Sequence, residues 1–223
     1  MPKLSITTKP LSPLAINLAR VSAASAALFL VLFALLHVLK PEIDPSWRFI
    51  SEYQLGQYGW MMHLAFWSLA VSSASLWFAV KSQIRTIGGY IGLFFLFVAT
   101  IGFVLAAANT TDPITATVGT DAGRIHSTGA LLASNVTGAI FFLSWSLARN
   151  KGWAKIRTSL WWVAAIGILT NLASFWMQGI MAQHQNVFGP DTPIGLPNHL
   201  LIIGLAGCLL VMASRIITAP KHQ

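Results

Sequence analysis

The chain has 223 residues, of which 55% are apolar and 9% are charged, and its mean hydropathy is +0.67. Soluble domains carry about 25% charged residues, so this composition excludes a cytosolic enzyme and a disordered chain. The formal net charge of +8 does not indicate nucleic-acid binding, because the Lys and Arg residues flank apolar stretches instead of clustering on one polar segment. A disulfide scaffold is excluded too, because Cys208 is the only cysteine.

Six apolar stretches of about 20 residues recur along the chain, and each is long enough to cross a hydrocarbon core of about 30 Å. Their length and their lack of period-2 alternation favour helices over barrel strands. The sequence therefore predicts an all-α bundle of six transmembrane helices that forms one domain over residues 1–223. The predicted spans are 18–39, 59–80, 87–108, 126–148, 158–181 and 197–218.

The distribution of Lys and Arg predicts the orientation of the bundle. Eleven of these residues fall in the two terminal segments and in the loops 81–86 and 149–157, whereas Lys40, Arg48 and Arg124 fall in the other loops. Positive charge is enriched in the cytoplasmic loops of membrane proteins, so both termini are expected to be cytoplasmic. The expected location is a bacterial cytoplasmic (inner) membrane.

The acidic residues and most histidines fall at the opposite, outer end of the predicted bundle. The six acidic residues are Glu42, Asp44, Glu52, Asp112, Asp121 and Asp191, and the five outer histidines are His37, His63, His126, His184 and His199. Ionisable groups at membrane depth are functional candidates by default. The one-sided distribution therefore predicts an outward-facing polar cavity that takes a lipid-like or other small ligand.

Polar and small residues mark one face in each of two spans. Asn171, Ser174 and Gln178 are spaced i, i+3, i+7 and share a face in the outer half of the fifth span. They would form either the deep polar wall of the cavity or hydrogen bonds between helices. A stripe of small residues along the fourth span predicts close approach of a neighbouring helix. This stripe consists of Ser127, Ala130, Ser134 and Gly138.

Two chemistries fit the outer set His63, Asp112 and His126. Two imidazoles and a carboxylate would hold Zn²⁺ with one position left for water, which would then attack an ester or amide. Alternatively, a histidine acts without metal as general base for Ser51 or Ser127. Residues predicted to contact a ligand are Asp44, Arg48, Glu52, Tyr53, Asn171, Gln178 and His199.

Structural roles compete with these functional interpretations. Asp44 and Asp112 each precede a proline, and an Asp-Pro pair is typical of a helix N-cap. Arg48 and Glu52 lie four residues apart, as in an ordinary surface ion pair. The sequence has no H-E-x-x-H and no G-x-S-x-G motif, so neither hydrolytic chemistry rests on an established signature.

Three groups of residues form motifs along the chain. The first group is HVLKP at 37–41, DP at 44–45, ISEY at 50–53 and GWMM at 59–62. The second group is TDP at 111–113 followed by Thr120, Gly123 and His126, and the third is Gly195-Leu196 followed by Asn198 and His199. These groups resemble the motifs of a bacterial and archaeal six-helix membrane family, which is catalogued as domain of unknown function nine-nine-eight. The second group is similar to that family's T-D-P and T-x-x-G-x-x-H, and in the third Asn198 and His199 occupy the places where the family usually has an acid or amide and an Arg.

This resemblance covers nearly the whole chain and implies six helices with the motifs at the outer face. It implies no activity. It marks Asp44, Ser51, Tyr53, Asp112 and His126 as positions to test, and the missing Arg weakens any expectation of an anion contact at that place.

The sequence thus leaves three functional classes open. The first is a metal-assisted hydrolase or other modifying enzyme for a lipid-like substrate, with zinc as its expected cofactor. The second is a module that binds or transports a small ligand, and the third is an accessory subunit whose outer loops dock a partner. Transport is disfavoured because few polar residues continue below the membrane midplane. The expected partners are the lipid bilayer and a lipid or small-molecule ligand at the outer face, nucleic acid is not expected, and the oligomeric state is not predicted.

Overall fold

The computed structural model describes residues 10–184 and 187–218, apart from the side chain of Ser174. The spanning helices are α1 (Pro13–Leu39), α2 (Gly59–Val80), α3 (Ile87–Ala108), α4 (Asp121–Ala133), α5 (Val136–Ala148), α6 (Arg157–Gln183) and α7 (Gly195–Ile217). Short 3₁₀ helices in the loops are η1 (Ile50–Gln54), η2 (Lys81–Gln83) and η3 (Lys151–Ile156). Six segments of this part of the chain are long and apolar enough to cross a membrane, which confirms the predicted six-helix membrane fold.

The helix boundaries follow local sequence signals. The predicted spans 59–80 and 87–108 coincide with α2 and α3. The first helix begins five residues earlier than predicted, because Ser12 caps its first turn by accepting a hydrogen bond from Ala15 N at 3.1 Å, and Pro13 is well placed at the first helical position. Lys3, Lys9 and Lys221, which contribute to the predicted orientation, lie outside the described residues.

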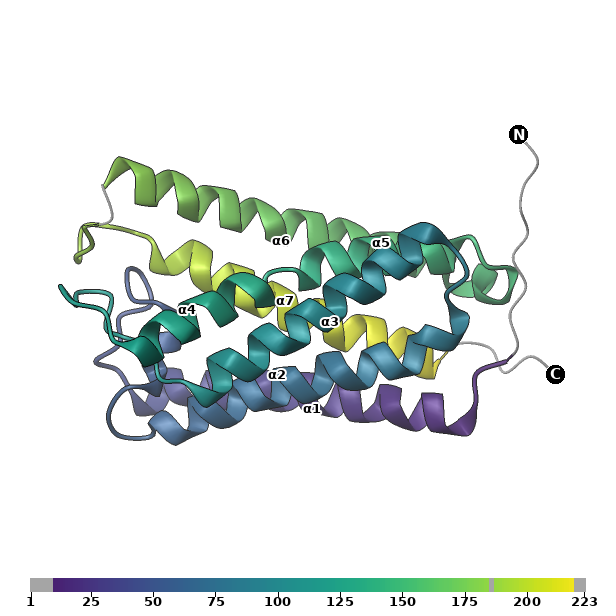
Figure 1. Ribbon diagram of the computed structural model, residues 1–223, viewed down its shortest axis with the longest axis horizontal. Helices are drawn as coiled ribbons and strands as arrows, with labels where there is room; N and C mark the ends of the chain where they lie inside the picture. Colours follow the sequence, from purple (N-terminus) through teal and green to yellow (C-terminus); the bar gives the residue numbers. More distant parts are fainter. Residues whose placement is uncertain (1–9, 185–186, 219–223) are drawn as a thin grey trace.

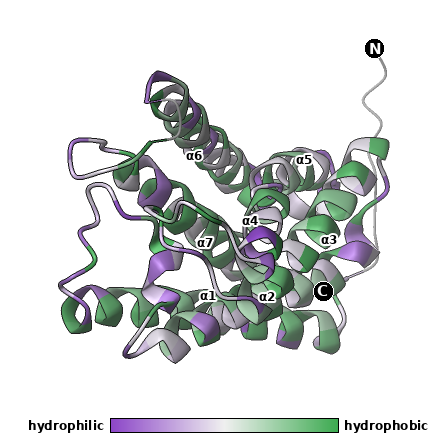
Figure 2. Cartoon of the chain, turned by 60° about the vertical axis from the view of Figure 1, so that its left-hand side comes forward, coloured by the Kyte–Doolittle hydropathy of each residue, from purple (hydrophilic) through white to green (hydrophobic). Residues whose placement is uncertain are grey.

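The chain runs around the bundle in order, so that consecutive spans are neighbours (Figure 1). The first helix packs against α2 and α7, and α3 packs against α2, α4 and α5. The ring closes through α6, which packs against α5 and α7. Hydrophobic residues dominate the helices, and hydrophilic residues concentrate in the connecting segments (Figure 2).

The fourth span is broken near its middle into α4 and α5. At the break, Asn135 Nδ2 donates to Leu132 O at 2.9 Å, and Thr137 Oγ1 donates to Ser134 O at 3.0 Å. These side chains satisfy carbonyls that lose their helical partners inside the membrane, where water is absent. Beyond the break, α5 packs against α6, but α4 stays on α3 and has no extensive packing with α6 in the described part of the chain.

The close contact between α3 and α4 depends on two glycines. A Cβ atom at Gly102 would lie 2.3 Å from Ala133 N, and one at Gly129 would lie 2.7 Å from Ala106 N. The predicted small-residue stripe is wrong on this point, because Ser127 and Ala130 are exposed. The buried face of α4 instead carries Gly123, His126, Gly129 and Ala133. The two glycines decide the face because a Cβ at either position would collide with the facing backbone.

We expect Gly129→Ala to lower the free energy of unfolding by about 1–3 kcal/mol, because the added methyl group would push α4 away from the backbone of α3. The measurement is thermal unfolding of the detergent-purified chain, followed by tryptophan fluorescence. Gly207→Ala is the matched control, since a Cβ there would meet no atom within 4 Å. Equal stability of the two variants would contradict the proposed contact.

Candidate functional site

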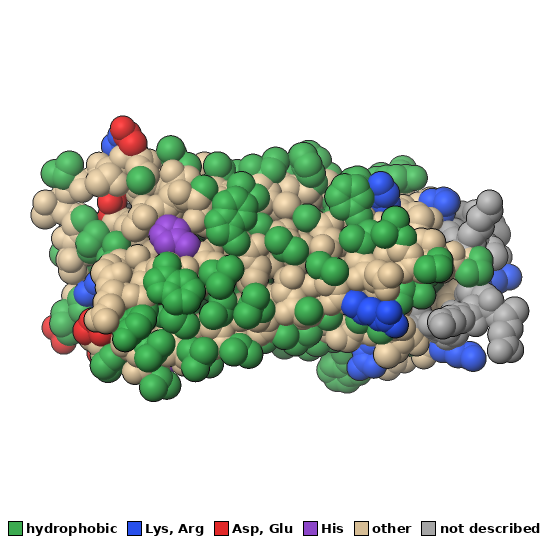
Figure 3. Space-filling view, turned by 90° about the horizontal axis from the view of Figure 1, so that it is seen from below, with side chains coloured by type: hydrophobic (Ala, Val, Ile, Leu, Met, Phe, Trp, Pro, Cys, Tyr) green, Lys and Arg blue, Asp and Glu red, His purple; other side chains and the backbone are tan. Residues whose placement is uncertain are grey.

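The described acidic side chains gather at one end of the bundle, and on the face shown in Figure 3 most Lys and Arg side chains lie toward the other. We call this end, formed by the loops 40–58, 109–120 and 184–194, the acidic end. All three motif groups identified in the sequence lie in or beside these loops.

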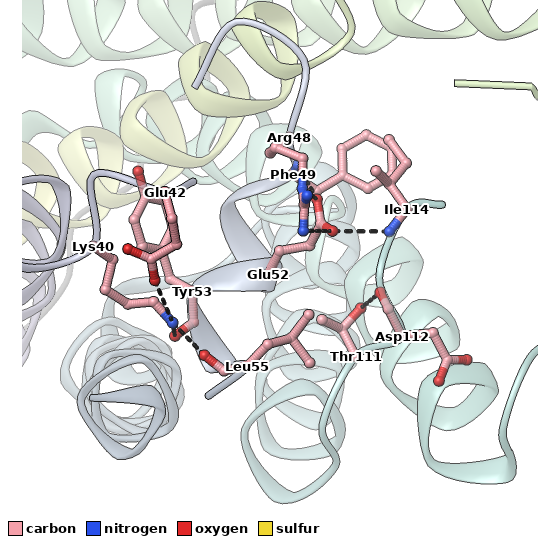
Figure 4. Close-up of polar contacts among 10 residues, drawn as sticks. All are labelled: Lys40, Glu42, Arg48, Phe49, Glu52, Tyr53, Leu55, Thr111, Asp112 and Ile114. Atoms are coloured by element: carbon pink, nitrogen blue, oxygen red, sulfur yellow. Dashed lines mark hydrogen bonds and ion pairs between the residues drawn. The ribbon is translucent and has the colours of Figure 1, made fainter. Parts of the chain in front are cut away.

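Glu52 is the most deeply buried charged group of the acidic end, with a fully buried side chain. Its Oε2 accepts hydrogen bonds from Arg48 Nε at 3.0 Å and Phe49 N at 2.9 Å, and its Oε1 accepts one from Ile114 N at 2.8 Å (Figure 4). Arg48 Nη2 also lies 2.8 Å from Oε1. The interpretation as an ordinary surface pair is therefore wrong: the carboxylate joins η1 to the α3–α4 loop.

Lys40 is the second buried charge at this end, with an exposed fraction of 2%. Its ammonium group donates to Leu55 O and to Tyr53 O and lies 3.7 Å from the carboxylate of Glu42 (Figure 4). It thus caps carbonyls at the end of η1. From the sequence, Lys40 was interpreted only through its charge, as evidence for the orientation of the bundle. Its place inside the HVLKP motif already indicated a structural role.

Two histidines and a glutamine bind the C-terminal end of α3. His63 Nδ1 donates to Ala107 O at 2.7 Å, and His126 Nδ1 donates to Ala106 O and to Asn109 O, both at 3.0 Å. Gln54 Nε2 donates to Ala106 O at 2.9 Å. The last carbonyls of a helix have no partners within the helix. His63 and His126 therefore satisfy α3 through Nδ1, and in the neutral imidazole the lone pair is then on Nε2.

The Asp112 carboxylate is bound to the start of α4. Its two oxygens accept hydrogen bonds from Thr120 N and Thr120 Oγ1, both at 2.8 Å. Thr120 in turn caps α4 by accepting from Gly123 N at 3.0 Å, so Thr120 and not Asp112 is the N-cap. A Cβ at Gly123 would lie 2.0 Å from the Asp112 carboxylate. The residues of the second motif therefore have this spacing because Asp112, Thr120 and Gly123 together form the N-terminal cap of α4.

Asp44 also has a local role. Its side chain accepts a hydrogen bond from Ser46 N at 2.9 Å, which closes a turn rather than starting a helix. Hydrogen bonds from the hydroxyl and the backbone N–H of Ser46 hold the pKa of Asp44 below its ordinary value. Asp44 is exposed, and with this lowered pKa its carboxylate is charged at neutral pH.

The predicted catalytic set is only partly brought together. His63 and His126 meet at the end of α3, whereas the Asp112 carboxylate is held by Thr120. Among the described residues, no group of three or more His, Cys, Asp and Glu side chains is arranged to hold a metal ion. The zinc site at these residues stays a prediction.

The predicted nucleophiles are not paired with a base. Ser51 is partly buried in η1, and Ser127 is exposed on α4. Within the described chain, the threonine or serine hydroxyls that approach an imidazole belong to Thr110, whose Oγ1 lies 3.4 Å from His63 Nε2, and Thr192, whose Oγ1 lies 3.4 Å from His184 Nδ1. Sequence reasoning missed Thr110, which directly precedes the TDP motif.

A second group of rings lies between α1, η1 and α7. The ring centre of His199 lies 5.4 Å from those of His37 and Phe33, and Tyr53 is 5.0 Å from His37. His199 Nδ1 donates to Gly195 O at 2.8 Å, but its Nε2 is buried with no hydrogen-bond partner. An unpaired buried acceptor costs about 1–3 kcal/mol. Among the described histidines, His199 is therefore the one whose buried ring nitrogen has no hydrogen-bond partner.

Tyr53 is a neutral member of this group. It is fully buried, and its hydroxyl donates to Ile43 O at 3.4 Å. Burial, followed by the charges of Glu42 and Asp44, raises the pKa of Tyr53 to about 12. The neighbouring Asn198 accepts a hydrogen bond from Ile50 N at 2.9 Å, so the third motif joins α7 to η1.

Two cavities flank α6 within the spanning region. One of about 220 Å³ lies between α5 and α6, and one of about 430 Å³ lies between α6 and α7. The first is lined by Thr137, Gly138, Phe141, Gly167, Ile168 and Asn171. The second is lined by Leu169, Thr170, Leu172, Ala173, Trp176 and Leu200. None of the histidines in the described part of the chain lines either cavity.

Of the predicted polar wall on α6, Asn171 lines the smaller cavity and Gln178 is exposed. The Asn171 carboxamide has no hydrogen-bond partner among the described residues. The side chain of Ser174 is not among those described.

Fold and site define a six-span integral membrane protein in which a buried network of hydrogen bonds joins α2, α3, α4 and α7 at the acidic end. The chain belongs to the family described as "Protein of unknown function (DUF998)", whose model matches residues 23–215. This confirms the resemblance found in the sequence motifs. No curated protein and no solved structure matches the chain.

We expect Glu52→Ala to lower the free energy of unfolding by about 3–5 kcal/mol, because the change leaves a partly buried Arg48 and two backbone N–H groups without a partner. The measurement is unfolding in detergent. Asp121→Ala is the control, since the Asp121–Arg124 pair is exposed and worth about 0–1 kcal/mol. A Glu52→Ala protein as stable as the control would show that the network does not hold the acidic end together.

Proposed function

We propose that this protein binds an uncharged, lipid-like molecule in the cavities beside α6. The observation that carries the proposal is the Asn171 carboxamide, which lines a cavity between α5 and α6 and lacks a partner within the described chain. A polar group in the middle of a membrane span is unfavourable unless something hydrogen-bonds to it. A ligand with a hydroxyl, ester, amide or quinone carbonyl would supply that partner.

The composition of the cavity walls supports a neutral ligand. The polar side chains that line the cavities are Thr137, Thr170 and Asn171, and every other lining residue is apolar or glycine. A charged headgroup would find no counter-charge there and would lose its hydration. The ligand therefore combines a hydrocarbon portion with a small uncharged hydrogen-bonding group.

The route into the larger cavity is sideways from the bilayer. Leu169, Leu172 and Trp176 line this cavity and are also exposed on the surface of α6. In a spanning helix such a surface faces lipid rather than water. The break between α4 and α5 gives access from the bilayer on the other side of α6, because α4 remains packed on α3 and leaves the outer part of α6 uncovered.

An enzyme for a lipid-like substrate is the second candidate function. The observation in its favour is the contact between the exposed Thr110 hydroxyl and His63 Nε2 at 3.4 Å, with the imidazole oriented by Ala107 O. A hydroxyl, a base and a group that orients the base are the parts of a nucleophilic site. The binding function is favoured because neither cavity reaches this pair.

The binding function predicts that a photoactivatable diacylglycerol in phosphatidylcholine vesicles labels the α5–α6 cavity of the full-length chain. Asn171→Leu should lower this labelling about three- to fivefold, the effect of one lost hydrogen bond. Labelling is measured by mass spectrometry of peptides. Gln178→Leu is the matched control, because it removes an amide from the same helix outside both cavities.

Equal labelling of wild type and Asn171→Leu would contradict the binding function. Labelling by an anionic photoactivatable phosphatidylglycerol at the same strength would contradict the neutral-ligand argument. Recovery of cleaved diacylglycerol with the wild type, but not with His63→Gln, would favour the enzyme instead.

We also propose that the acidic end faces away from the cytoplasm, as the distribution of Lys and Arg predicts. A green fluorescent protein fused to the C-terminus of the full chain should be fluorescent in bacterial cells, and alkaline phosphatase fused there should be inactive. The opposite pattern would contradict cytoplasmic termini.

A further inference from the structure

His199 carries a lone pair with no partner in the protein interior. It lies in the first turn of α7 with an exposed fraction of 7%, and its Nδ1 donates to Gly195 O at 2.8 Å. A carbonyl oxygen only accepts hydrogen bonds, so the proton is on Nδ1 and Nε2 is an acceptor. This Nε2 is buried and has no hydrogen-bond partner. Whatever satisfies it must be a proton donor or a metal ion.

His37 lies beside His199, and its Nδ1 is likewise bound to a backbone carbonyl four residues earlier in the chain. It lies in the last turn of α1, and its Nδ1 donates to Phe33 O at 2.9 Å, so in the neutral imidazole the lone pair is on Nε2. The two ring centres are 5.4 Å apart, with their planes inclined by 75°. Two lone-pair donors cannot satisfy each other, and each imidazole is already oriented by a backbone carbonyl in the manner of metal-binding histidines.

The separation of the rings suits a shared ion. Two imidazoles that bind one tetrahedral ion through Nε2 at about 2.0–2.1 Å place their ring centres about 5 Å apart. The observed 5.4 Å is close to that value. Tyr53 packs against His37 at 5.0 Å between ring centres, and its hydroxyl donates to Ile43 O instead. Phe33 and Tyr53 are therefore the walls of the pair.

The surroundings favour a cation that arrives from the aqueous side. His37 is only half-buried, and the exposed carboxylates Glu42 and Asp44 follow it in the α1–α2 loop. Negative charge at the mouth of a site raises the local concentration of cations. The ammonium of Lys40, in the same loop, is held by carbonyls of η1 and by Glu42.

We propose that His37 and His199 bind one divalent transition-metal ion, Zn²⁺ or Cu²⁺, through their Nε2 atoms, with water in the remaining positions. Imidazole pairs select these ions, whereas Ca²⁺ and Mg²⁺ prefer oxygen ligands. This site is separate from the cavities beside α6 and from the set His63, Asp112 and His126. It joins the end of α1 to the start of α7, two helices that pack against each other.

The test uses the full-length chain, purified in detergent with a tag that contains no histidine and treated with chelator. Zn²⁺ binding is measured by calorimetry, and Cu²⁺ is added for electron paramagnetic resonance, which reports nitrogen ligands directly. We expect one ion per chain and a spectrum with two nitrogen donors. His199→Phe and His37→Phe should each weaken binding at least about tenfold, since loss of an orienting group alone costs about 10–100-fold.

Phenylalanine keeps the ring packing, and unchanged elution and thermal unfolding would show that the variants fold. His63→Gln is the matched control, because His63 also donates Nδ1 to a carbonyl at the acidic end. Unchanged binding in His199→Phe would overturn the proposal, as would the absence of stoichiometric binding in the wild type. Loss of binding in His63→Gln alone would overturn it too and would assign the ion to the set His63, Asp112 and His126.

Discussion

The acidic end depends on the burial of one carboxylate. Glu52 is fully removed from solvent, and a buried charge is tolerated only when its oxygens are paired. Its partners come from both sides: Arg48 and Phe49 from its own loop and Ile114 from the loop between α3 and α4. The two loops are therefore fixed relative to each other, and with them the helices that they connect.

The same requirement explains most of the family motifs. The last turn of α3 presents carbonyls without helical partners, and Gln54, His63 and His126 satisfy them. At the start of α4 the unpaired groups are backbone N–H donors, and the side chains of Asp112 and Thr120 accept hydrogen bonds from them. Residues that look catalytic in the sequence thus act here as hydrogen-bond partners of helix ends. Polar atoms that lack a partner in the described chain, such as those of Asn171 and His199, are better guides to a ligand.

Much of the fold could be predicted from the sequence, because a bilayer imposes a strong local rule. Each span must be long, apolar and helical, so α2 and α3 were placed to the residue. The start of α1 was missed because Ser12 and Pro13 extend the helix beyond its most apolar part. The contact face of α4 was also missed, because several of its faces carry small residues and only the approach of α3 selects Gly129.

The sequence by itself determined the membrane class, the six spans and the gathering of His, Asp and Glu at one end. These properties follow from composition and from the order of residues along the chain. Only the tertiary structure decided which of those groups are already satisfied. The pairing of Glu52 with Ile114, or of His37 with His199, joins residues far apart in the chain. Such contacts are set by how helices pack, which no local pattern encodes.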